Sequence, residues 1–246
     1  MEKLYEGKAK IIYPTDDPQI LLTRFKDDAT AFNAQKKGTI AQKGAINCRI
    51  SSALFQLLEQ QGIATHYIEQ VSPTEMRVKA VTILPLEVVV RNIAAGSLCR
   101  QTGLAEGTVL PFPLVEFYYK KDELGDPLLT RDRVFILNLA SLNQLEQLES
   151  KALAINTSLK TFFSACQITL VDFKLEFGLD VQQNLLLADE ISPDTCRLWD
   201  QAHSDDPQAR VLDKDRFRKD LGNVETAYEE VQTRILSQIE LTTHSE

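Results

Sequence analysis

The sequence predicts an α+β protein. Runs with β-strand character cluster before residue 93 and again after residue 167, and long helical segments lie between them, so strands and helices do not alternate strictly. The chain has 246 residues, of which 43% are hydrophobic and 25% charged. It can therefore bury a substantial core, either in one domain or in two lobes that share a cleft.

The N-terminal part should form a small antiparallel sheet. Four β-rich runs are expected there, at residues 4–13, 20–25, 64–71 and 75–81, and a further run follows at residues 86–92. The first two flank a turn at Pro14–Pro18 and should form a hairpin. We place a lobe boundary near Thr82–Pro85, which gives an N-terminal sheet lobe with one helix over residues 1–84 and a larger α+β lobe over residues 85–246.

The spacing of apolar residues predicts helices in three places. The first covers residues 46–58 and ends at Gly62. The second is long and begins at the capping box Ser141–Gln144. The third is expected over residues 215–239, where Gly222 weakens the first half.

Charge and cysteine content exclude several classes of protein. The net charge of −8 argues against a protein that coats nucleic acid or anionic membranes, so neither partner is expected. No apolar run approaches the length of a membrane span. The four cysteines have no C-x-x-C spacing, which predicts reduced thiols and a cytoplasmic protein.

Two strands are predicted over residues 168–177 and 185–188, with a turn at Gln182-Gln183. In the first strand, alternation places charged side chains on one face and apolar side chains on the other. The charged face holds Asp172, Lys174 and Glu176, and the apolar face holds Phe173, Leu175 and Phe177. The apolar face should join the core, which leaves the charged face for chemistry.

Asp189 follows the second of these strands, and the assumed register sets it directly opposite Glu176, with Cβ atoms about 4.5–5.5 Å apart. Two like charges in that position are destabilising unless a cation lies between them. Mg²⁺ prefers one or two carboxylates completed by substrate phosphates, so the pair predicts a magnesium site. The alternative is a solvated polar face whose charges pair with one another.

Two other motifs suggest phosphate binding. Gly7-Lys8-Ala9-Lys10 lets the backbone approach a phosphate that the ammonium groups neutralise, although an edge strand protected against aggregation would have similar residues. Arg91 ends an apolar strand and Ser97 opens a helix, which suits a phosphate monoester. Alternatively, Ser97 is a plain N-cap and Arg91 an ion-pair partner. Walker A, G-x-G-x-x-G, H-R-D and G-x-S-x-G sequences do not occur.

Taken in order, four motifs resemble the phosphoribosylaminoimidazole-succinocarboxamide synthases, also called SAICAR synthetases. They are GKAK from Gly7, VVRNIAAGS ending at Ser97, DFKLEFG from Asp172 and DEISPDTCRLWD from Asp189. The resemblance extends from Leu4 to the DKDRFR run that begins at Asp213, which is nearly the whole chain.

The resemblance implies an ATP-dependent carbon–nitrogen ligase of de novo purine biosynthesis (EC 6.3.2.6). Such enzymes condense carboxyaminoimidazole ribonucleotide (CAIR) with L-aspartate and release SAICAR, ADP and phosphate. The resemblance further implies Mg²⁺, a homodimer, and a two-lobed ATP-binding fold similar to the layouts of kinases and ATP-grasp enzymes, with ATP in the cleft.

The family's site residues carry over position by position. ATP would be bound by Gly7, Lys8, Ala9 and Lys10 at its phosphates, by the hinge residues Lys79, Val81 and Leu84, and by Lys120. Lys174, Glu176 and Asp189 would be catalytic, with Glu176 and Asp189 as magnesium ligands. The ribonucleotide would be bound by Arg91, Ser97, Lys174 and Arg197, with Lys214 and Arg218 as further candidates. No L-aspartate role is carried over to Asn33, Lys36 or Lys43, because the loop over residues 27–44 varies in this family.

The implied chemistry is activation of a carboxylate by phosphoryl transfer, followed by displacement of phosphate by the amine of aspartate. The protein would supply positioning and electrostatics rather than a nucleophile. Two alternatives stay open at this point: a phosphotransferase with a kinase-like cleft, and a nucleotide-sensing module without catalysis.

Overall fold

The computed structural model describes residues 2–31 and 36–243, and within these ranges the protein is α+β, as the sequence predicts. The strands are β1 (Tyr5–Glu6), β2 (Lys10–Pro14), β3 (Ile20–Phe25), β4 (Asp28–Ala31), β5 (Lys36–Thr39), β6 (Tyr67–Ser72), β7 (Glu75–Lys79), β8 (Thr82–Ile93), β9 (Val109–Tyr119), β10 (Leu128–Leu129), β11 (Ile168–Leu179), β12 (Leu185–Ala188) and β13 (Cys196–Asp200). The helices are α1 (Lys43–Gln60), α2 (Ser97–Thr102), α3 (Arg131–Ile136), α4 (Leu142–Ala165), α5 (Asp215–Arg218) and α6 (Val224–Thr243), with short 3₁₀ helices at Asp122–Leu124 and Gln201–His203.

The small sheet is antiparallel and has the order β1-β2-β3-β7-β6. The predicted hairpin is confirmed as β2 and β3. The run over residues 4–13, however, is not one strand. The chain reverses between β1 and β2, so that Tyr5 pairs with Ile12, and the amide of Gly7 donates to the carbonyl of Lys10 at 2.8 Å. The strand β1 is therefore the edge of the sheet, and residues 7–9 form a tight turn beside it.

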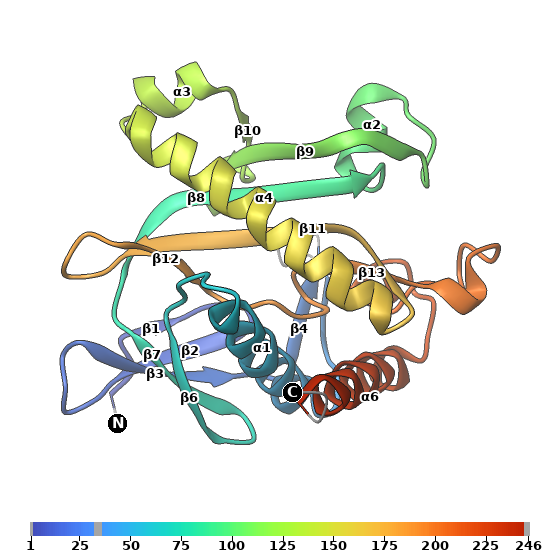
Figure 1. Cartoon of the computed structure of the whole chain (residues 1–246), viewed down its shortest axis with the longest axis horizontal. Coiled ribbons are helices and arrows are strands. Elements are labelled where there is room, and N and C mark those ends of the chain that lie inside the picture. The colour runs from blue at the N-terminus through green and yellow to red at the C-terminus, as the bar shows by residue number, and fades with distance from the viewer. Residues whose placement is uncertain (1, 32–35, 244–246) are drawn as a thin grey trace.

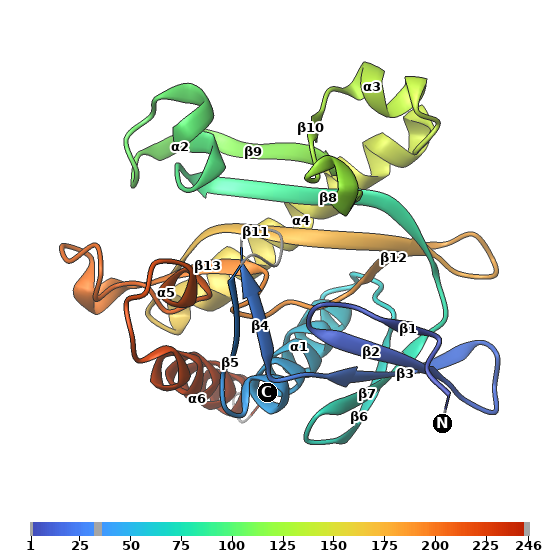
Figure 2. The ribbon, with the colours of Figure 1, turned by 180° about the vertical axis from the view of Figure 1, so that it is seen from behind.

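The large sheet has the order β10-β9-β8-β11-β12, and β13 pairs with β11 as well. Pro85, which was expected to separate two elements, lies inside β8 instead. The chain leaves the small sheet at Lys79 and enters the large sheet at Thr82, so the expected lobe boundary falls within the first residues of β8. The division into lobes over residues 1–84 and 85–246 stays a prediction. The hairpin of β4 and β5, which was not expected, forms a separate two-stranded sheet (Figure 2).

The register between β11 and β12 differs from the expected one by one residue. Glu176 pairs with Ala188 rather than with Asp189. Ala188 is completely buried, and a buried position there favours the small apolar side chain over a carboxylate. Asp189 follows the strand with a φ of 64°, a left-handed conformation that breaks the alternation and changes the direction of its side chain.

Two of the three predicted helices are confirmed. The helix α1 covers the first, and both hydrogen bonds of the capping box at Ser141 and Gln144 are present at the start of α4. The third prediction was one continuous helix, which is wrong. The chain forms the short α5, turns at Gly222 with a φ of 69°, and then forms α6. Asp220 and Asn223 also have positive φ, of 53° and 50°, so the segment between the two helices is a turn in which glycine adopts its angle without strain.

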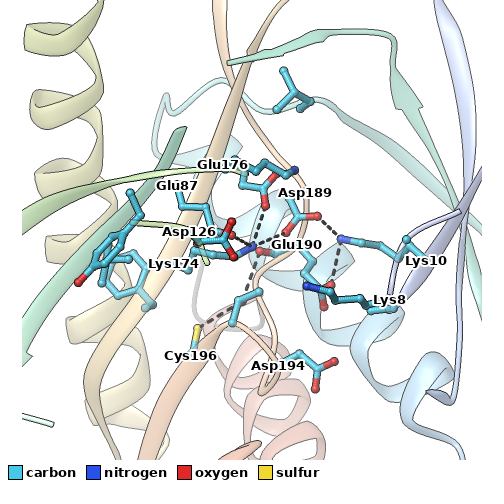
Figure 3. A pocket seen from close by; sticks show the side chains of 18 of the residues that line it. Lys8, Lys10, Glu87, Asp126, Lys174, Glu176, Asp189, Glu190, Asp194 and Cys196 are labelled. Atoms are coloured by element: carbon cyan, nitrogen blue, oxygen red, sulfur yellow. Dashed lines mark hydrogen bonds and ion pairs between the residues drawn. The ribbon is translucent and has the colours of Figure 1, made fainter. Parts of the chain in front are cut away.

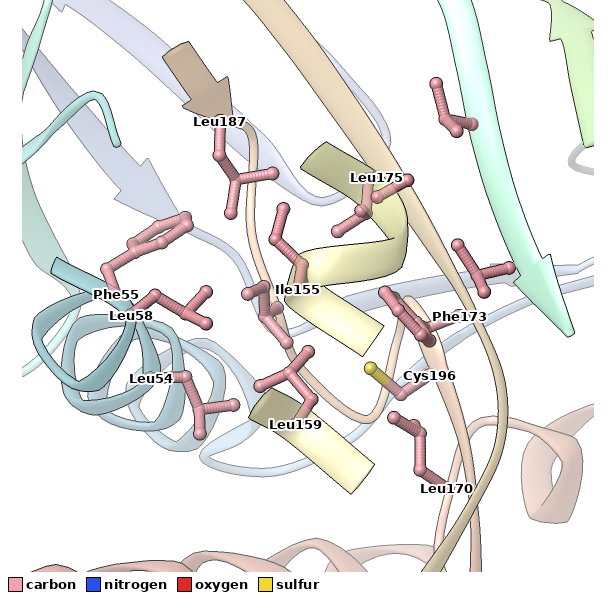
Figure 4. Packing of buried hydrophobic residues seen from close by; sticks show 14 of the residues in the cluster. Leu54, Phe55, Leu58, Ile155, Leu159, Leu170, Phe173, Leu175, Leu187 and Cys196 are labelled. Atoms are coloured by element: carbon pink, nitrogen blue, oxygen red, sulfur yellow. The ribbon is translucent and has the colours of Figure 1, made fainter. Parts of the chain in front are cut away.

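The hydrophobic core is continuous, with α4 packed on the large sheet and α1 packed on the small sheet (Figure 4). Leu54, Phe55 and Leu58 come from α1, Ile155 and Leu159 from α4, and Phe173, Leu175 and Phe177 from β11. The predicted alternation of β11 is thus confirmed, because its apolar face is buried and its opposite face carries the charges. The helix α6 packs beside α1 (Figure 1). Within the described residues, every helix is too short or too polar to cross a membrane.

Candidate active site

A cleft of about 820 Å³ lies between the two sheets and collects nearly all of the residues predicted to bind ligands. Those that line it are Gly7, Lys8, Ala9, Lys10, Lys79, Val81, Arg91, Ser97, Lys120, Lys174, Glu176, Asp189, Arg197, Lys214 and Arg218. Leu84 differs from this set because its side chain lies in the hydrophobic core. Segments far apart in the sequence thus meet at one cavity.

The turn over residues 7–9 lies at the edge of the cleft. Lys8 forms an ion pair of 2.8 Å with Asp122, which follows β9 on the other side of the cavity, and both side chains are exposed. Lys10 lies deeper, and its side chain is only 13% exposed. The burial of Lys10 therefore contradicts the alternative of a solvated edge strand. The exposed Lys8, taken alone, would be consistent with it.

The expected hinge passes along the cleft where the chain crosses from β7 to β8. Lys79 and Val81 line the cavity there, and Ile83 does so in place of the buried Leu84. The backbone of Gly178 on β11 comes so close to Val81 that a Cβ at Gly178 would be 2.6 Å from the Val81 Cγ2 atom. Only glycine permits this close approach of the hinge to the large sheet.

Carboxylates and ammonium groups alternate at the centre of the cleft (Figure 3). The Nζ atom of Lys174 is 2.7 Å from Glu176, 3.0 Å from Glu87 and 3.8 Å from Asp189. Lys120 forms a second ion pair with Glu176. Glu176 and Asp189 therefore meet around the ammonium group of Lys174, even though they are not cross-strand partners.

The charges in this cluster fix one another's protonation states. Burial alone would raise the pKa of Asp189, but Lys10 and Lys174 outweigh that effect and hold its pKa below the ordinary value. Burial would likewise lower the pKa of Lys174, and the neighbouring carboxylates of Glu176 and Asp189 raise it well above the ordinary value instead. The carboxylate of Asp189 and the ammonium of Lys174 are both charged at neutral pH.

Two carboxylates of this cluster were missed from the sequence. Glu87 on β8 lies directly across from Glu176 on β11. Glu190 forms an ion pair of 2.9 Å with Lys10. Glu87 is the only charged residue in the apolar run over residues 83–90, which is a signal that could have been used. Glu190 had no comparable signal, because its role depends on a contact with the distant β2.

The carboxylates at the centre of the cleft suit a cation that takes only one or two ligands from the protein. Within residues 2–31 and 36–243, no group of three or more His, Cys, Asp or Glu side chains is arranged to enclose a metal ion. Glu176 and Asp189 instead face ammonium groups in positions where a cation is favourable. Mg²⁺ commonly takes one or two carboxylates and completes its coordination with phosphates and water, so these residues fit it.

The other end of the cleft is built around Asp172, which lies between two arginines in the sheet. Arg91 on β8 and Arg197 on β13 are its cross-strand partners, and each guanidinium is 2.8 Å from a carboxylate oxygen of Asp172. Glu116 holds Arg91 from the far side at 2.6 Å, and Asp215 holds Arg197 at 2.9 Å. The two guanidinium groups are thus fixed side by side.

Ser97 belongs to the arginine end as well. Gly96 is the N-cap residue of α2 and Ser97 is the first helical residue, so the interpretation of Ser97 as an N-cap is wrong. The hydroxyl of Ser97 accepts a hydrogen bond of 2.9 Å from Arg91. Gly96 has a φ of 57°, and a Cβ there would be 2.5 Å from the Arg197 Nη2 atom. The small-residue turn therefore allows Arg197 to lie against the backbone.

Lys214 and Arg218 complete this end. Arg218 is 2.6 Å from Asp215, while Lys214 is 3.6 Å from Asp194, a carboxylate that Lys43 contacts more closely at 2.8 Å. Burial lowers the pKa of Lys214, and the nearby charges of Arg218 and Lys43 lower it further, while Asp194 opposes them. Lys36 contacts the exposed Asp220 near α5, and Asn33 lies outside the described residues.

Comparisons with known proteins agree with this arrangement. A profile of the SAICAR synthetase family matches residues 3–235. The phosphoribosylaminoimidazole-succinocarboxamide synthase of Picosynechococcus sp. is 67% identical over 239 residues, covering 97% of this chain and 95% of the relative. A crystal structure of the synthase from Ehrlichia chaffeensis superposes with a TM-score of 0.91 at 46% identity, covering 95% of this chain and 98% of the other. A SAICAR synthetase in complex with ADP superposes with a TM-score of 0.90 at 47% identity, covering 95% and 97%.

Proposed function

The chain belongs to the SAICAR synthetase family, and we propose that it catalyses the ATP-dependent condensation of CAIR with L-aspartate to give SAICAR, ADP and phosphate. It is a ligase of de novo purine biosynthesis on this assignment. One observation supports it most directly. A single cleft holds a lysine-bearing turn, a group of carboxylates and a pair of fixed guanidinium groups, which are the parts needed to bring a nucleotide and an anionic acceptor together.

ATP is assigned to the side of the cleft formed by the small sheet. The turn over residues 7–9 and the buried Lys10 would face its phosphates, and the hinge at Lys79 and Val81 would contact adenine. Lys120 reaches the same region from the loop after β9. A solved structure of a SAICAR synthetase that is 47% identical is a complex with ADP, which supports nucleotide binding by this fold.

Magnesium is assigned to Glu176 and Asp189, the carboxylates that meet around Lys174. When bound, Mg²⁺ supplies positive charge that stabilises the transferring phosphoryl group. Lys10, Lys120 and Lys174 offset charge in the same region and hold the carboxylates in place.

CAIR is assigned to the arginine end. Its 5′-phosphate would be bound by the fork of Arg91 together with the hydroxyl of Ser97, and Arg197, Lys214 and Arg218 would supply further positive charge. Lys174 lies between the two ends of the cleft, so it would orient the reacting carboxylate of CAIR toward the terminal phosphate of ATP.

We infer that the reaction passes through an acyl phosphate. A carboxylate oxygen of CAIR attacks the γ-phosphorus of ATP, and the bond from that phosphorus to the bridging oxygen of ADP breaks. The neutral amine of L-aspartate then attacks the activated carbonyl carbon, phosphate leaves, and the amine loses a proton. The lysines and arginines of the cleft position these groups and offset charge, and a side-chain nucleophile is not needed.

One coupled assay separates this ligase from the alternatives. ADP release that requires both CAIR and L-aspartate supports the ligase. ADP release with another acceptor supports a phosphotransferase, and nucleotide binding without release supports a sensor. An ¹⁸O-transfer experiment tests the acyl phosphate: movement of ¹⁸O from the carboxylate of CAIR to the released phosphate is expected, and its absence contradicts the intermediate.

We also infer that the protein works in the cytoplasm as a homodimer, in keeping with the family resemblance. Light scattering on the purified chain is expected to give twice the mass of one 27.7 kDa chain. A mass of one chain at the concentration used for the assay would contradict the dimer.

A further inference from the structure

The inference concerns Glu190, a carboxylate in the cleft that has no role in the assignments above. Its side chain is 3% exposed and forms an ion pair of 2.9 Å with the Nζ atom of Lys10. Lys10 contacts Asp189 at the same time, so a single ammonium group bridges two consecutive carboxylates (Figure 3). The two carboxylates differ in how firmly the rest of the protein holds them.

Glu190 is fixed by the loop between β12 and β13. Its second carboxylate oxygen accepts a hydrogen bond of 2.5 Å from the hydroxyl of Ser192, which is 1% exposed. The same hydroxyl accepts a bond of 3.1 Å from the amide of Asp194. Glu190 therefore cannot turn away without breaking a buried network, and its own charge needs Lys10 as a counterion.

Asp189 is held less tightly. Its side chain is 19% exposed and lies 3.8 Å from a second ammonium group, that of Lys174. It is also one of the two residues assigned to magnesium. A carboxylate that binds a divalent cation attracts a neighbouring ammonium less strongly, because the cation repels it. Lys10 would then lose one of its two partners while the nucleotide is bound.

We propose that Glu190 is a positioning residue that keeps the Lys10 ammonium on the nucleotide phosphates when Asp189 binds the metal. A lysine side chain is flexible, and holding its charge in place beforehand reduces the entropy lost when phosphate binds. The inference rests on the proposed function, because it takes Lys10 as a phosphate ligand and Asp189 as a metal ligand.

The test is the dissociation constant of ADP, measured by calorimetry on the full chain with and without magnesium. Glu190→Gln keeps the shape and can still accept from Ser192, but it removes the charge. With magnesium, we expect ADP to bind about tenfold more weakly. Without magnesium, Asp189 still holds Lys10, so the change should stay within about twofold.

The matched control is Glu75→Gln, which removes a carboxylate from the ion pair with Arg24 on the small sheet, outside the cleft. Its dissociation constants should equal those of the wild type. In a Lys10→Met background, Glu190→Gln should produce no further loss of affinity, because its effect acts through Lys10. A purely structural role would instead give additive losses in that background.

Three results would overturn the inference: unchanged ADP affinity in Glu190→Gln with magnesium, equal losses with and without magnesium, or wild-type affinity in Lys10→Met. If Glu190→Gln does not fold, Ser192→Ala replaces it, and a loss of about threefold that requires magnesium is expected. Failure of the proposed function is a separate result. The wild-type protein would then bind ADP but would not form ADP from ATP when CAIR and L-aspartate are added.

Discussion

Two carboxylates on the strand β11, Asp172 and Glu176, have opposite kinds of neighbour. Asp172 lies between Arg91 and Arg197, so its cross-strand partners on both sides carry the opposite charge. Glu176 lies across from Glu87, a like charge, and depends on Lys120 and Lys174 for its ion pairs. The same strand thus carries one carboxylate between two opposite charges and one carboxylate opposite a like charge, and the second pair is held together by lysine ammonium groups.

The difference indicates how each end of the cleft treats its ligand. At the Asp172 end, rigid guanidinium forks are already oriented and remain so when an anion binds to their outer edge. At the Glu176 end, ammonium groups of flexible lysines occupy positions that suit a metal ion. Binding of magnesium and nucleotide there must exchange these ion pairs, whereas binding at the arginine end preserves them.

The largest effect is expected from removing the charges at the Glu176 end. Glu176→Gln or Asp189→Asn should lower kcat by at least about 10³-fold, since several kcal/mol of transition-state stabilisation depend on the metal. The measurement is ADP release during a magnesium titration, with circular dichroism to confirm folding. Near-normal rates at saturating magnesium in either variant would refute the assignment of these ligands.

At the opposite end, Asp172→Asn should affect the ribonucleotide and not the nucleotide. The carboxylate is 6% exposed, and without it the buried guanidinium of Arg91 and the half-buried one of Arg197 repel each other, which corresponds to about 3 kcal/mol. We expect the KM for CAIR to rise about 100-fold while the KM for ATP stays within about twofold. If both constants rise equally, the two ends are not independent and the comparison fails.

The stability of the segment that holds Arg197 should also depend on pH, through Asp213. Burial and the charge of Asp215 raise the pKa of Asp213 to about 7, and its carboxylate accepts the amides of Leu198 and Asp215 at 2.8 Å. A folded-state pKa above the unfolded value near 4 means that the folded protein binds the proton more tightly. This contribution to stability is complete below pH 4 and is lost as the pH rises to 7.

We expect the unfolding free energy to fall by on the order of 2 kcal/mol across that window. Urea denaturation between pH 5 and pH 8 measures it. Asp213→Asn should flatten the profile above pH 5, where the other carboxylates are already ionised. The same slope in the variant would assign the pH dependence to a different group.

Features set by neighbours in sequence could be predicted. The alternation of β11 and the capping box at Ser141 depend on residues close together in the chain, and both are confirmed. The register of β11 with β12 could not be predicted, because it is set by the turn between Leu179 and Leu185, in which Gln183 has a φ of 65°, and the spacing of charges did not reveal that turn. The metal pair was therefore predicted from a wrong register, and its residues meet through Lys174 instead.

Contacts between elements that are far apart in the sequence could not be predicted from sequence patterns. The family resemblance named Arg91 and Arg197, but their joint attachment to Asp172 depends on the order of β8, β11 and β13 in the sheet. Glu190 was missed for the same reason. Small residues precede Ser97 in the sequence, yet only the structure shows which atom requires the glycine.

Substitution of Gly96 tests the position of Arg197 and should have the smallest effect of these variants. In Gly96→Ala, the new Cβ would be 2.5 Å from the Arg197 guanidinium, which must move away from the position where Asp172 holds it. We expect CAIR to bind about tenfold more weakly and ATP to bind normally. Gly103→Ala is the matched control, because Gly103 also has a positive φ, of 76°, but has open space around its Cβ position. The control introduces the backbone strain of about 1 kcal/mol without the clash, so an equal loss of CAIR affinity in both variants would show that the position of Arg197 does not matter.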